Sequence, residues 1–482
     1  MQSPLLAQIG GHIDGRWQLQ SCKDPIVVRN PADGAVLAEV PQAGEDDVRR
    51  AIESAARAMR EVPPLATRRA WLETIATRLL ESRDELGRII TLENGKPLAE
   101  ARAEVEYSAG FFRNAAAHID RLAPRVAAEN VKGCRWHVYQ RPAGVAGLIT
   151  PWNFPLGMLA KKLSAVLAAG CGAVIKPARQ TPLSVIALWN LLEAIDLPPG
   201  LLNLVIGESG PIARALFDHP LVRVISFTGS TEIGRKLIES SAPGIKRLSL
   251  ELGGNAPFIV MEDADIAAAA EGLIASKFRG AGQTCVCANR VLVHERVAPA
   301  FTEAVVERVA RLRVGNGLDP ETTIGPLIDR DGWNKVHEHT TDALHRGATR
   351  VFGEIPQAPQ HDWGCFYPPT VLTGITRGMR IWSEETFGPV VAITTFGDKD
   401  DVLEMANDTI CGRAAYVLTR DAERAARLAA GLHFGYVGWN TGTGPTPEAP
   451  FGGMKQSGFG REGGDEGLLE FCEAQTVAEK LP

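Results

Sequence analysis

One cysteine stands in a stretch of small and polar residues that a substrate could approach closely. The stretch, residues 277–289, reads KFRGAGQTCVCAN and places the thiol of Cys285 near its centre. Arg279 lies six residues before this cysteine, and Cys287 lies two residues after it. A thiolate is a strong nucleophile, so the loop is a candidate for covalent catalysis. A lone cysteine is more often buried and inert, and only partners elsewhere in the chain can overturn that alternative.

The composition is that of an ordinary soluble protein. The chain has 482 residues, of which 45% are hydrophobic and 22% charged, and at about 150 residues per domain it should form two or three domains. A net charge of −6 argues against a general nucleic-acid binder, which carries a surplus of Lys and Arg. The eight cysteines are not spaced like those of a disulfide-rich protein, which favours reduced thiols over disulfides. With no signal peptide and no apolar run of about 18 residues, we expect a cytoplasmic protein without a membrane partner.

Alternating strand and helix patterns from residue 144 onward must position the loop. The expected strands are 145–149, 173–176, 202–205 and 224–228, and the expected helices are 157–169, 181–196, 210–218 and 231–241. Strands that alternate with crossover helices predict a doubly wound parallel sheet, which binds ligands at the carboxyl ends of its strands.

Other elements flank this sheet. Three helical patterns precede it, at about 48–59, 65–92 and 98–121. A second βα-rich region, with helices near 263–280 and 297–312 and a strand at 290–294, follows and runs to about residue 435. Strand patterns at 134–141 and 473–479 stand outside both regions, and such strands often pair with another copy, so we expect a homo-oligomer.

Three strand ends in the expected sheet carry groups that suit a nucleotide. Residues 227–230 run from a strand through a glycine turn into a helix, which offers backbone N–H groups to a phosphate, although no GxGxxG or P-loop motif is present. Lys176 ends a second strand, and Glu251 ends a third beside two glycines. Together with Cys285, these groups predict covalent catalysis coupled to a nucleotide.

At this point a family resemblance is clear. The motifs that carry it are Trp152-Asn153-Phe154-Pro155, Phe227-Thr228-Gly229-Ser230, Glu251-Leu252-Gly253-Gly254, Gly282-Gln283-Thr284-Cys285, Glu385-Thr386-Phe387-Gly388-Pro389 and Pro450-Phe451-Gly452-Gly453. In this order they resemble the aldehyde dehydrogenase superfamily, and residues 248–258 and 277–289 are similar to its succinate-semialdehyde dehydrogenase branch. The resemblance implies an α/β fold: a doubly wound parallel-sheet cofactor domain, a second α/β catalytic domain and a small β extension for oligomerisation.

The same resemblance divides the chain. The implied parts are a nucleotide domain at 1–121 and 144–251, a catalytic domain at 252–435, oligomerisation strands at 122–143 and 470–482, and a substrate-tunnel and C-terminal signature segment at 436–469. Homodimers or homotetramers are implied as well.

The resemblance also implies a mechanism. Cys285, as thiolate, attacks the aldehyde carbon, while the Asn153 amide and the Cys285 backbone N–H stabilise the oxyanion. After hydride transfer to NAD(P), Glu251 activates the water that hydrolyses the thioester. Retention of all three residues argues against the rival reading, a non-catalytic relative kept as a scaffold.

Thirteen positions are implied to bind the cofactor. They are Thr150, Pro151, Trp152, Lys176, Arg179, Gly207, Phe227, Thr228, Gly229, Ser230, Leu252, Glu385 and Phe387. Glu385 is assigned to the nicotinamide ribose and Phe387 to packing against that end of the cofactor. Members that prefer NAD commonly have a glutamate where Arg179 stands, and an arginine can hold a 2′-phosphate. We therefore predict NADP as the preferred cofactor, with NAD as the alternative if Arg179 points to water.

The implied substrate residues are Lys161, Arg279, Thr284 and Phe451. The semialdehyde branch holds a distal carboxylate with two arginines and a hydroxyl. Here Lys161 replaces one arginine, and Pro445 stands where the serine would lie. Succinic semialdehyde is the leading substrate. Longer dicarboxylic semialdehydes and uncharged aldehydes are the alternatives, and a purely structural ion pair is the alternative for the two cations.

Three smaller expectations complete the reading. Cys287 resembles the redox partner of the nucleophile in this branch, with a small buried filler as the alternative. Phe111 and Phe112 are expected on the helix that lines the substrate tunnel. His337-Glu338-His339 lacks the spacing of a zinc motif and is expected to be solvated surface, so we predict no metal site.

Overall fold

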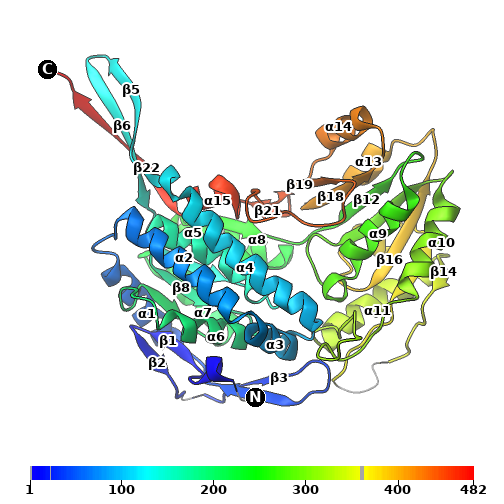
Figure 1. Ribbon diagram of the computed structural model, residues 1–482, viewed down its shortest axis with the longest axis horizontal. Coiled ribbons are helices and arrows are strands. Elements are labelled where there is room, and N and C mark those ends of the chain that lie inside the picture. The colour runs from blue at the N-terminus through cyan, green and yellow to red at the C-terminus, as the bar shows by residue number, and fades with distance from the viewer. Residues whose placement is uncertain (1–2, 22, 359–362) are drawn as a thin grey trace.

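The computed structural model describes residues 3–21, 23–358 and 363–482. Within these residues the chain forms two large sheets, one of eight and one of seven strands, with helices packed around each (Figure 1). The α/β fold class expected from the sequence is confirmed by these two sheets and their helices.

The first sheet has the strand order β2-β1-β9-β8-β7-β10-β11-β21. Its strands are β1 (Gly11–Ile13), β2 (Arg16–Gln18), β7 (Val145–Ile149), β8 (Ala173–Lys176), β9 (Leu202–Leu204), β10 (Val222–Thr228), β11 (Arg247–Glu251) and β21 (Gly458–Phe459). The five central strands, in the order β9-β8-β7-β10-β11, pair in parallel. Every residue of β7 and β8 is buried, which explains why both strands read as unbroken apolar runs.

Eight helices belong to this half of the chain. They are α1 (Glu45–Ala58), α2 (Leu65–Glu81), α3 (Arg83–Asn94), α4 (Leu98–His118), α5 (Gly157–Ala169), α6 (Leu183–Leu192), α7 (Ser209–Asp218) and α8 (Thr231–Ser241). The single helical stretch expected at 65–92 is wrong, because the chain breaks at Ser82 into α2 and α3. Serine favours helix ends over helix interiors, and here it ends one helix and precedes the next.

The second sheet has the order β14-β15-β16-β13-β12-β18-β19. Its strands are β12 (Ala256–Val260), β13 (Ala288–His294), β14 (Thr349–Phe352), β15 (Thr370–Thr373), β16 (Val390–Phe396), β18 (Ala414–Leu418) and β19 (Tyr436–Trp439). Its helices are α9 (Ile266–Lys277), α10 (Ala298–Val309), α11 (Arg330–His345), α12 (Arg380–Ser383), α13 (Val402–Asn407) and α14 (Ala422–Gly431), and α15 (Gly464–Leu469) follows near the C-terminus. Aspartates at 265, 329, 401 and 421 cap four of these helices, which fixes where each begins.

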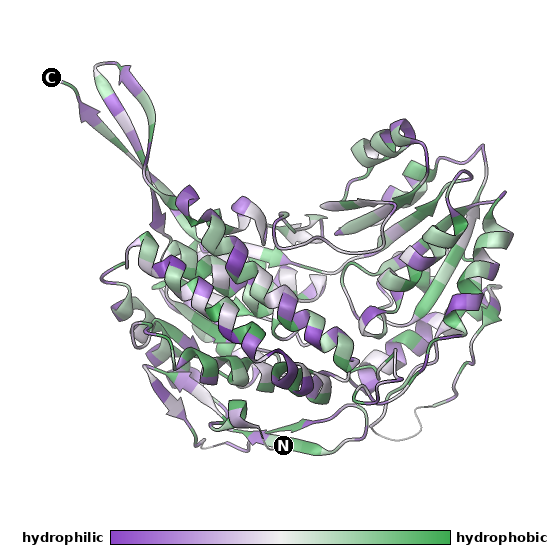
Figure 2. Cartoon of the chain, viewed as in Figure 1, coloured by the Kyte–Doolittle hydropathy of each residue, from purple (hydrophilic) through white to green (hydrophobic). Residues whose placement is uncertain are grey.

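A three-stranded antiparallel sheet projects from the body of the molecule (Figure 1). It consists of β5 (Arg125–Val131), β6 (Cys134–Pro142) and β22 (Cys472–Lys480), so the two strands expected outside the main regions pair with each other. We call these three strands the extension. Figure 2 shows mainly hydrophobic strands in the large sheets, whereas the extension mixes hydrophilic and hydrophobic residues.

The remaining elements are short. They are η1 (Pro4–Leu6), η2 (Ile119–Leu122), η3 (Ala242–Gly244), η4 (Arg279–Gly282), β3 (Ile26–Arg29), β4 (Val36–Val40), β17 (Cys411–Gly412) and β20 (Met454–Lys455). Among the described residues, no helix combines the length and apolar character that crossing a membrane requires.

Candidate active site

The cysteine loop connects α9 to β13 and is shaped by left-handed backbone. Gly280, Ala281 and Gly282 have φ values of 58°, 56° and 77°. A Cβ on Gly282 would lie 2.3 Å from the carbonyl oxygen of Gly388, so only glycine allows this approach. The loop is thereby packed against the Glu385–Gly388 segment, which comes from a distant part of the chain.

Cys285 lies where two cavities meet. It lines one cavity of about 300 Å³ and a second of about 370 Å³, so its sulfur can be reached from both. Burial raises the pKa of the thiol to about 11, and the positive charge of Lys161 is the largest influence that opposes this rise. In this state the residue is mostly a thiol at neutral pH, and the cations of the cavity favour the thiolate that catalysis needs.

Asn153 is held beside the nucleophile loop. Its side-chain amide donates a 2.9 Å hydrogen bond to the carbonyl oxygen of Gln283, two residues before Cys285. The carbonyl oxygen of Asn153 accepts a 2.8 Å bond from the buried ammonium of Lys96, which in turn pairs with Glu104 at 2.5 Å. The Cys285 N–H has no acceptor within the described parts of the chain. The Asn153 amide and the Cys285 N–H are therefore both donors of residues that line the second cavity.

Glu251 ends β11 and faces the second cavity with a buried carboxylate. One of its oxygens, Oε2, is ion-paired with the buried guanidinium of Arg413. Arg413 is fixed by further bonds to the carbonyl oxygens of Leu252, at 2.6 Å, and Ser457, at 2.9 Å. The other oxygen, Oε1, has no hydrogen-bond partner among the described residues. It is the oxygen that could accept a proton from water.

A third cavity, of about 700 Å³, lies at the carboxyl ends of β7, β8 and β10. Eight of the expected cofactor residues line it: Thr150, Pro151, Trp152, Lys176, Arg179, Phe227, Thr228 and Gly229. Burial, reinforced by the charge of Arg179, lowers the pKa of Lys176 to about 8. Arg179 itself is exposed and forms no ion pair or hydrogen bond with the described residues.

The donors in this cavity fit an anionic dinucleotide. The buried hydroxyl of Thr228 has no hydrogen-bond partner in the described part of the chain, and Ser230 caps α8 by accepting a 3.3 Å bond from the Ile233 N–H. The helix N-terminus and two nearby cations favour phosphate groups. Gly207 does not line this cavity. It packs instead against Ala43, whose carbonyl oxygen would lie 2.8 Å from a Cβ at this position.

The second cavity links the cofactor residues to the thiol. It is lined by Ser230, Leu252, Glu385 and Phe387, together with Asn153, Glu251 and Cys285. Glu385 accepts a 2.9 Å bond from the Gly254 N–H, and burial raises the pKa of its carboxyl to about 7. Phe387, at a φ of 58°, packs edge-to-face on Trp152 with ring centroids 5.7 Å apart.

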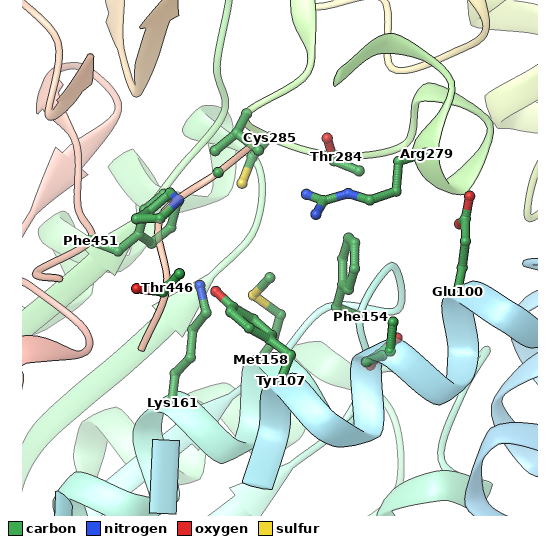
Figure 3. Close-up of a pocket in the computed structure, with 15 residues that line it drawn as sticks. Glu100, Tyr107, Phe154, Met158, Lys161, Arg279, Thr284, Cys285, Thr446 and Phe451 are labelled. Carbon is green, nitrogen blue, oxygen red and sulfur yellow. The ribbon is translucent and has the colours of Figure 1, made fainter. Parts of the chain in front are cut away.

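The first cavity holds the expected substrate residues. Lys161, Arg279, Thr284 and Phe451 line it together with Tyr107, Phe154 and Thr446 (Figure 3). Lys161 rises from α5 with its ammonium 4.0 Å from the centroid of Phe451, and Arg279 extends from the facing loop over the ring of Phe154. The nearest carboxylate to Lys161 is Glu462, at 3.8 Å. Arg279 has no ion pair or hydrogen bond within the described residues.

Comparison with known proteins agrees with this arrangement. The model of the aldehyde dehydrogenase family matches residues 17–477. The chain belongs to that family. A succinate-semialdehyde dehydrogenase [NADP(+)] of Escherichia coli is 45% identical over 464 residues, which cover 96% of this chain and 95% of the relative. A glutarate-semialdehyde dehydrogenase of Pseudomonas aeruginosa is 43% identical over 472 residues, covering 96% and 95%.

Solved structures of other aldehyde dehydrogenases superpose on this chain as well. A succinate-semialdehyde dehydrogenase from Burkholderia pseudomallei superposes with a TM-score of 0.96 at 42% identity and covers both chains completely. A betaine aldehyde dehydrogenase from Staphylococcus aureus, solved with NAD⁺, superposes with a TM-score of 0.94 at 33% identity, covering 98% of this chain and 95% of that one. The protein is thus an NAD(P)-dependent aldehyde dehydrogenase similar to the succinate-semialdehyde enzymes.

The expectation that His337-Glu338-His339 is solvated surface is wrong for His339. Its side chain is fully buried against the cofactor loop of this aldehyde dehydrogenase, with Nδ1 3.2 Å from the Thr386 hydroxyl and Nε2 3.2 Å from the Glu384 carboxylate. Burial lowers the pKa of the ring to about 4, so it is neutral at pH 7. Of the tripeptide, only Glu338 is exposed.

The helix expected to line the substrate tunnel, α4, does line the cavity, but Phe111 and Phe112 are not among its lining residues. Both are buried in the core around α4. The helix instead presents an earlier set of residues to the cavity: Glu100, Ala103, Glu104 and Tyr107. Their i, i+3, i+4, i+7 spacing marks one helix face, which was the available sequence signal.

Cys287 lies outside all three cavities. It is buried, with its sulfur 3.7 Å from the Lys277 carbonyl oxygen and 3.6 Å from that of Ala288. Burial raises the pKa of this thiol as well. Its role as a redox partner of Cys285 stays a prediction. No disulfide is found among the described cysteines, and Cys22 lies outside the described residues.

Proposed function

We propose that this aldehyde dehydrogenase oxidises a semialdehyde with a carboxylate at its far end, with succinic semialdehyde as the leading substrate and NADP as the preferred cofactor. The observation that carries the proposal is the pair of cations in the substrate cavity. Among the described residues, Arg279 has no ion pair or hydrogen bond, and Lys161 has a 3.8 Å contact with Glu462, a carboxylate that Lys162 already holds at 2.5 Å. The Lys161 ammonium is buried and Arg279 is exposed, and a substrate carboxylate would give both cations an anionic partner.

The acidic residues of the cavity do not fill that need. Glu104 is occupied by Lys96 and by the N–H groups of Leu156 and Gly157. Glu100 accepts a 2.8 Å bond from the Gly280 N–H. The buried hydroxyl of Thr284 adds another donor, for which the described residues offer no acceptor. The free groups in the cavity are therefore mainly donors, as an anion site requires. The relatives from Escherichia coli and Pseudomonas aeruginosa are dehydrogenases of succinate and glutarate semialdehyde, which supports the same substrate class.

The proposed reaction uses the three residues at the second cavity. The Cys285 thiolate adds to the aldehyde carbon, and the oxyanion accepts hydrogen bonds from the Asn153 amide and the Cys285 N–H. NAD(P), when bound, supplies the hydride acceptor that converts the adduct to a thioester. Glu251, through its free Oε1, takes a proton from the water that attacks this thioester, and the acid leaves with the thiolate restored.

The carboxylate site predicts substrate selectivity. Replacing Lys161 or Arg279 with Met should lower the kcat/KM ratio of succinic semialdehyde to butanal about 10- to 100-fold, since each change removes a charged hydrogen bond to the carboxylate. Steady-state kinetics on C4 to C8 semialdehydes beside the matching uncharged aldehydes measures this. The control variant is Arg350→Met, which removes an exposed cation outside the substrate cavity. If butanal equals succinic semialdehyde in the wild type, the carboxylate site is wrong.

Arg179 predicts the cofactor preference. An Arg179→Glu variant should lower the ratio of kcat/KM for NADP over NAD about 10- to 100-fold, because the guanidinium that would bind the 2′-phosphate becomes a repelling carboxylate. The ratio measured with one aldehyde tests this, with Arg350→Glu as the matched control. A wild type that prefers NAD, together with an unchanged ratio in the variant, would show that Arg179 points to water.

The extension supports a further part of the proposal, oligomerisation. Valines 126, 131 and 477 expose 40–47% of their surface on its strands, and all residues of β22 after Cys472 are exposed. A protruding sheet with free edges and exposed apolar residues is a typical surface for a second copy of the chain. We propose a homodimer or homotetramer and retain the domain division given above.

A further inference from the structure

We propose that the Tyr107 hydroxyl is a substrate-recognition group of this enzyme, and that it forms with Lys161 a two-donor fork for the substrate carboxylate. The inference rests on the proposed semialdehyde function and adds a residue to it. Pro445 lines the cavity and offers neither a hydroxyl nor a backbone N–H to an anion.

Lysine alone is a poor match for a carboxylate. A guanidinium presents two parallel N–H groups to the two carboxylate oxygens, whereas an ammonium is a point charge without that planar geometry. Arg279 approaches the cavity from the facing loop, so on the α5 side Lys161 offers the carboxylate a single point charge. A second donor close to the ammonium would complete the pair.

Tyr107 stands in that place. It belongs to α4 and lines the same cavity as Lys161, whose ammonium lies 5.6 Å from the centroid of the tyrosine ring. Figure 3 shows the hydroxyl of Tyr107 and the ammonium of Lys161 pointing into the same part of the cavity, below Cys285. The hydroxyl has no hydrogen-bond partner among the described residues.

Both side chains are fixed by their surroundings. The Tyr107 ring packs edge-to-face on Phe111 with centroids 4.9 Å apart. The Lys161 side chain is only 2% exposed, and its ammonium lies 4.0 Å from the centroid of Phe451 and 5.5 Å from that of Phe111. Two donors held by packing lose little conformational entropy when they bind a ligand, which favours recognition.

Thr446 is the rival source of the hydroxyl. It lines the cavity next to Pro445, but it is exposed and belongs to a segment without regular structure. In Figure 3 its oxygen points away from the Lys161 ammonium. The geometry therefore favours Tyr107.

A set of single and double variants tests the fork. In Tyr107→Phe, the kcat/KM ratio of succinic semialdehyde to butanal should fall about 10-fold through a higher KM for the semialdehyde, because one charged hydrogen bond is lost. In a Lys161→Met background the same change should have a smaller effect, since the carboxylate is no longer held beside the phenol. Tyr139→Phe, on the exposed extension, is the matched control.

The outcomes separate this inference from the proposed function. If Lys161→Met and Arg279→Met leave the substrate ratio unchanged, the carboxylate site itself fails. If those variants lower the ratio but Tyr107→Phe does not, or Thr446→Val lowers it instead, only the Tyr107 assignment is overturned. An equal loss with both substrates in Tyr107→Phe would show a structural role and would also contradict the fork.

Discussion

A Cys285→Ser variant is expected to lose more than about 1,000-fold in kcat with any aldehyde. Serine is a far weaker nucleophile than a thiolate, and no imidazole that could activate its hydroxyl lines either cavity at this position. The rate of NADPH formation at saturating aldehyde and NADP measures the loss. Circular dichroism and thermal unfolding should show a folded protein, because the change replaces one sulfur with oxygen.

Cys287→Ser is the matched control for this variant. Cys287 lines none of the three cavities, so its replacement should leave kcat within about threefold of the wild type. If Cys285→Ser retained a tenth or more of the activity, covalent catalysis at this thiol would be excluded. If Cys287→Ser lost as much as Cys285→Ser, the nucleophile would be assigned to the wrong cysteine.

Glu251→Gln is expected to lower steady-state turnover about 100- to 10,000-fold while leaving the first turnover largely intact. The carboxylate is needed when water attacks the thioester, which comes after hydride transfer. A glutamine still accepts the Arg413 hydrogen bond but cannot take a proton. Stopped-flow absorbance should therefore show a burst of about one NADPH per site, followed by a very slow phase.

The burst distinguishes two roles for Glu251. A variant without any burst would mean that this carboxylate acts earlier, for example by deprotonating Cys285. Unchanged steady-state turnover would remove it from the mechanism altogether. Glu473→Gln, an exposed carboxylate on the extension, should behave as the wild type.

Much of the fold could be predicted because its strands are fully buried. The runs Val145–Ile149 and Ala173–Lys176 have no polar face, and their alternation with helices leaves little freedom except a parallel sheet. The sequence does not predict the break between α2 and α3, because Ser82 lies within a continuous helical pattern, whereas the contacts of α3 with α4 and α6 are visible only in the structure.

The central residues of the site could also be found from the sequence, because each lies in its own motif. Cys285, Glu251 and Asn153 converge on one cavity although they are separated by up to 132 positions. Most of the cofactor positions line the expected cavity too, whereas Gly207 packs against Ala43 instead. Their catalytic and binding roles remain proposals.

The residues that sequence reasoning missed act through tertiary contacts alone. Arg413 pairs with Glu251 from the bend between β17 and β18, 162 positions away, and no motif in the neighbouring sequence indicates a buried arginine. His339 has charged neighbours and helical spacing, so only the packing of α11 against the loop at Thr386 explains its burial. Tyr107 enters the site because α4 turns that face toward the thiol.

The most direct test is the mass of the peptide that carries Cys285, taken from the Glu251→Gln variant after mixing with succinic semialdehyde and NADP. The account predicts one succinyl group on Cys285, released by hydroxylamine as a thioester should be, and absent when NADP is omitted. A succinyl group on another residue, or none despite a full burst of NADPH, would contradict it.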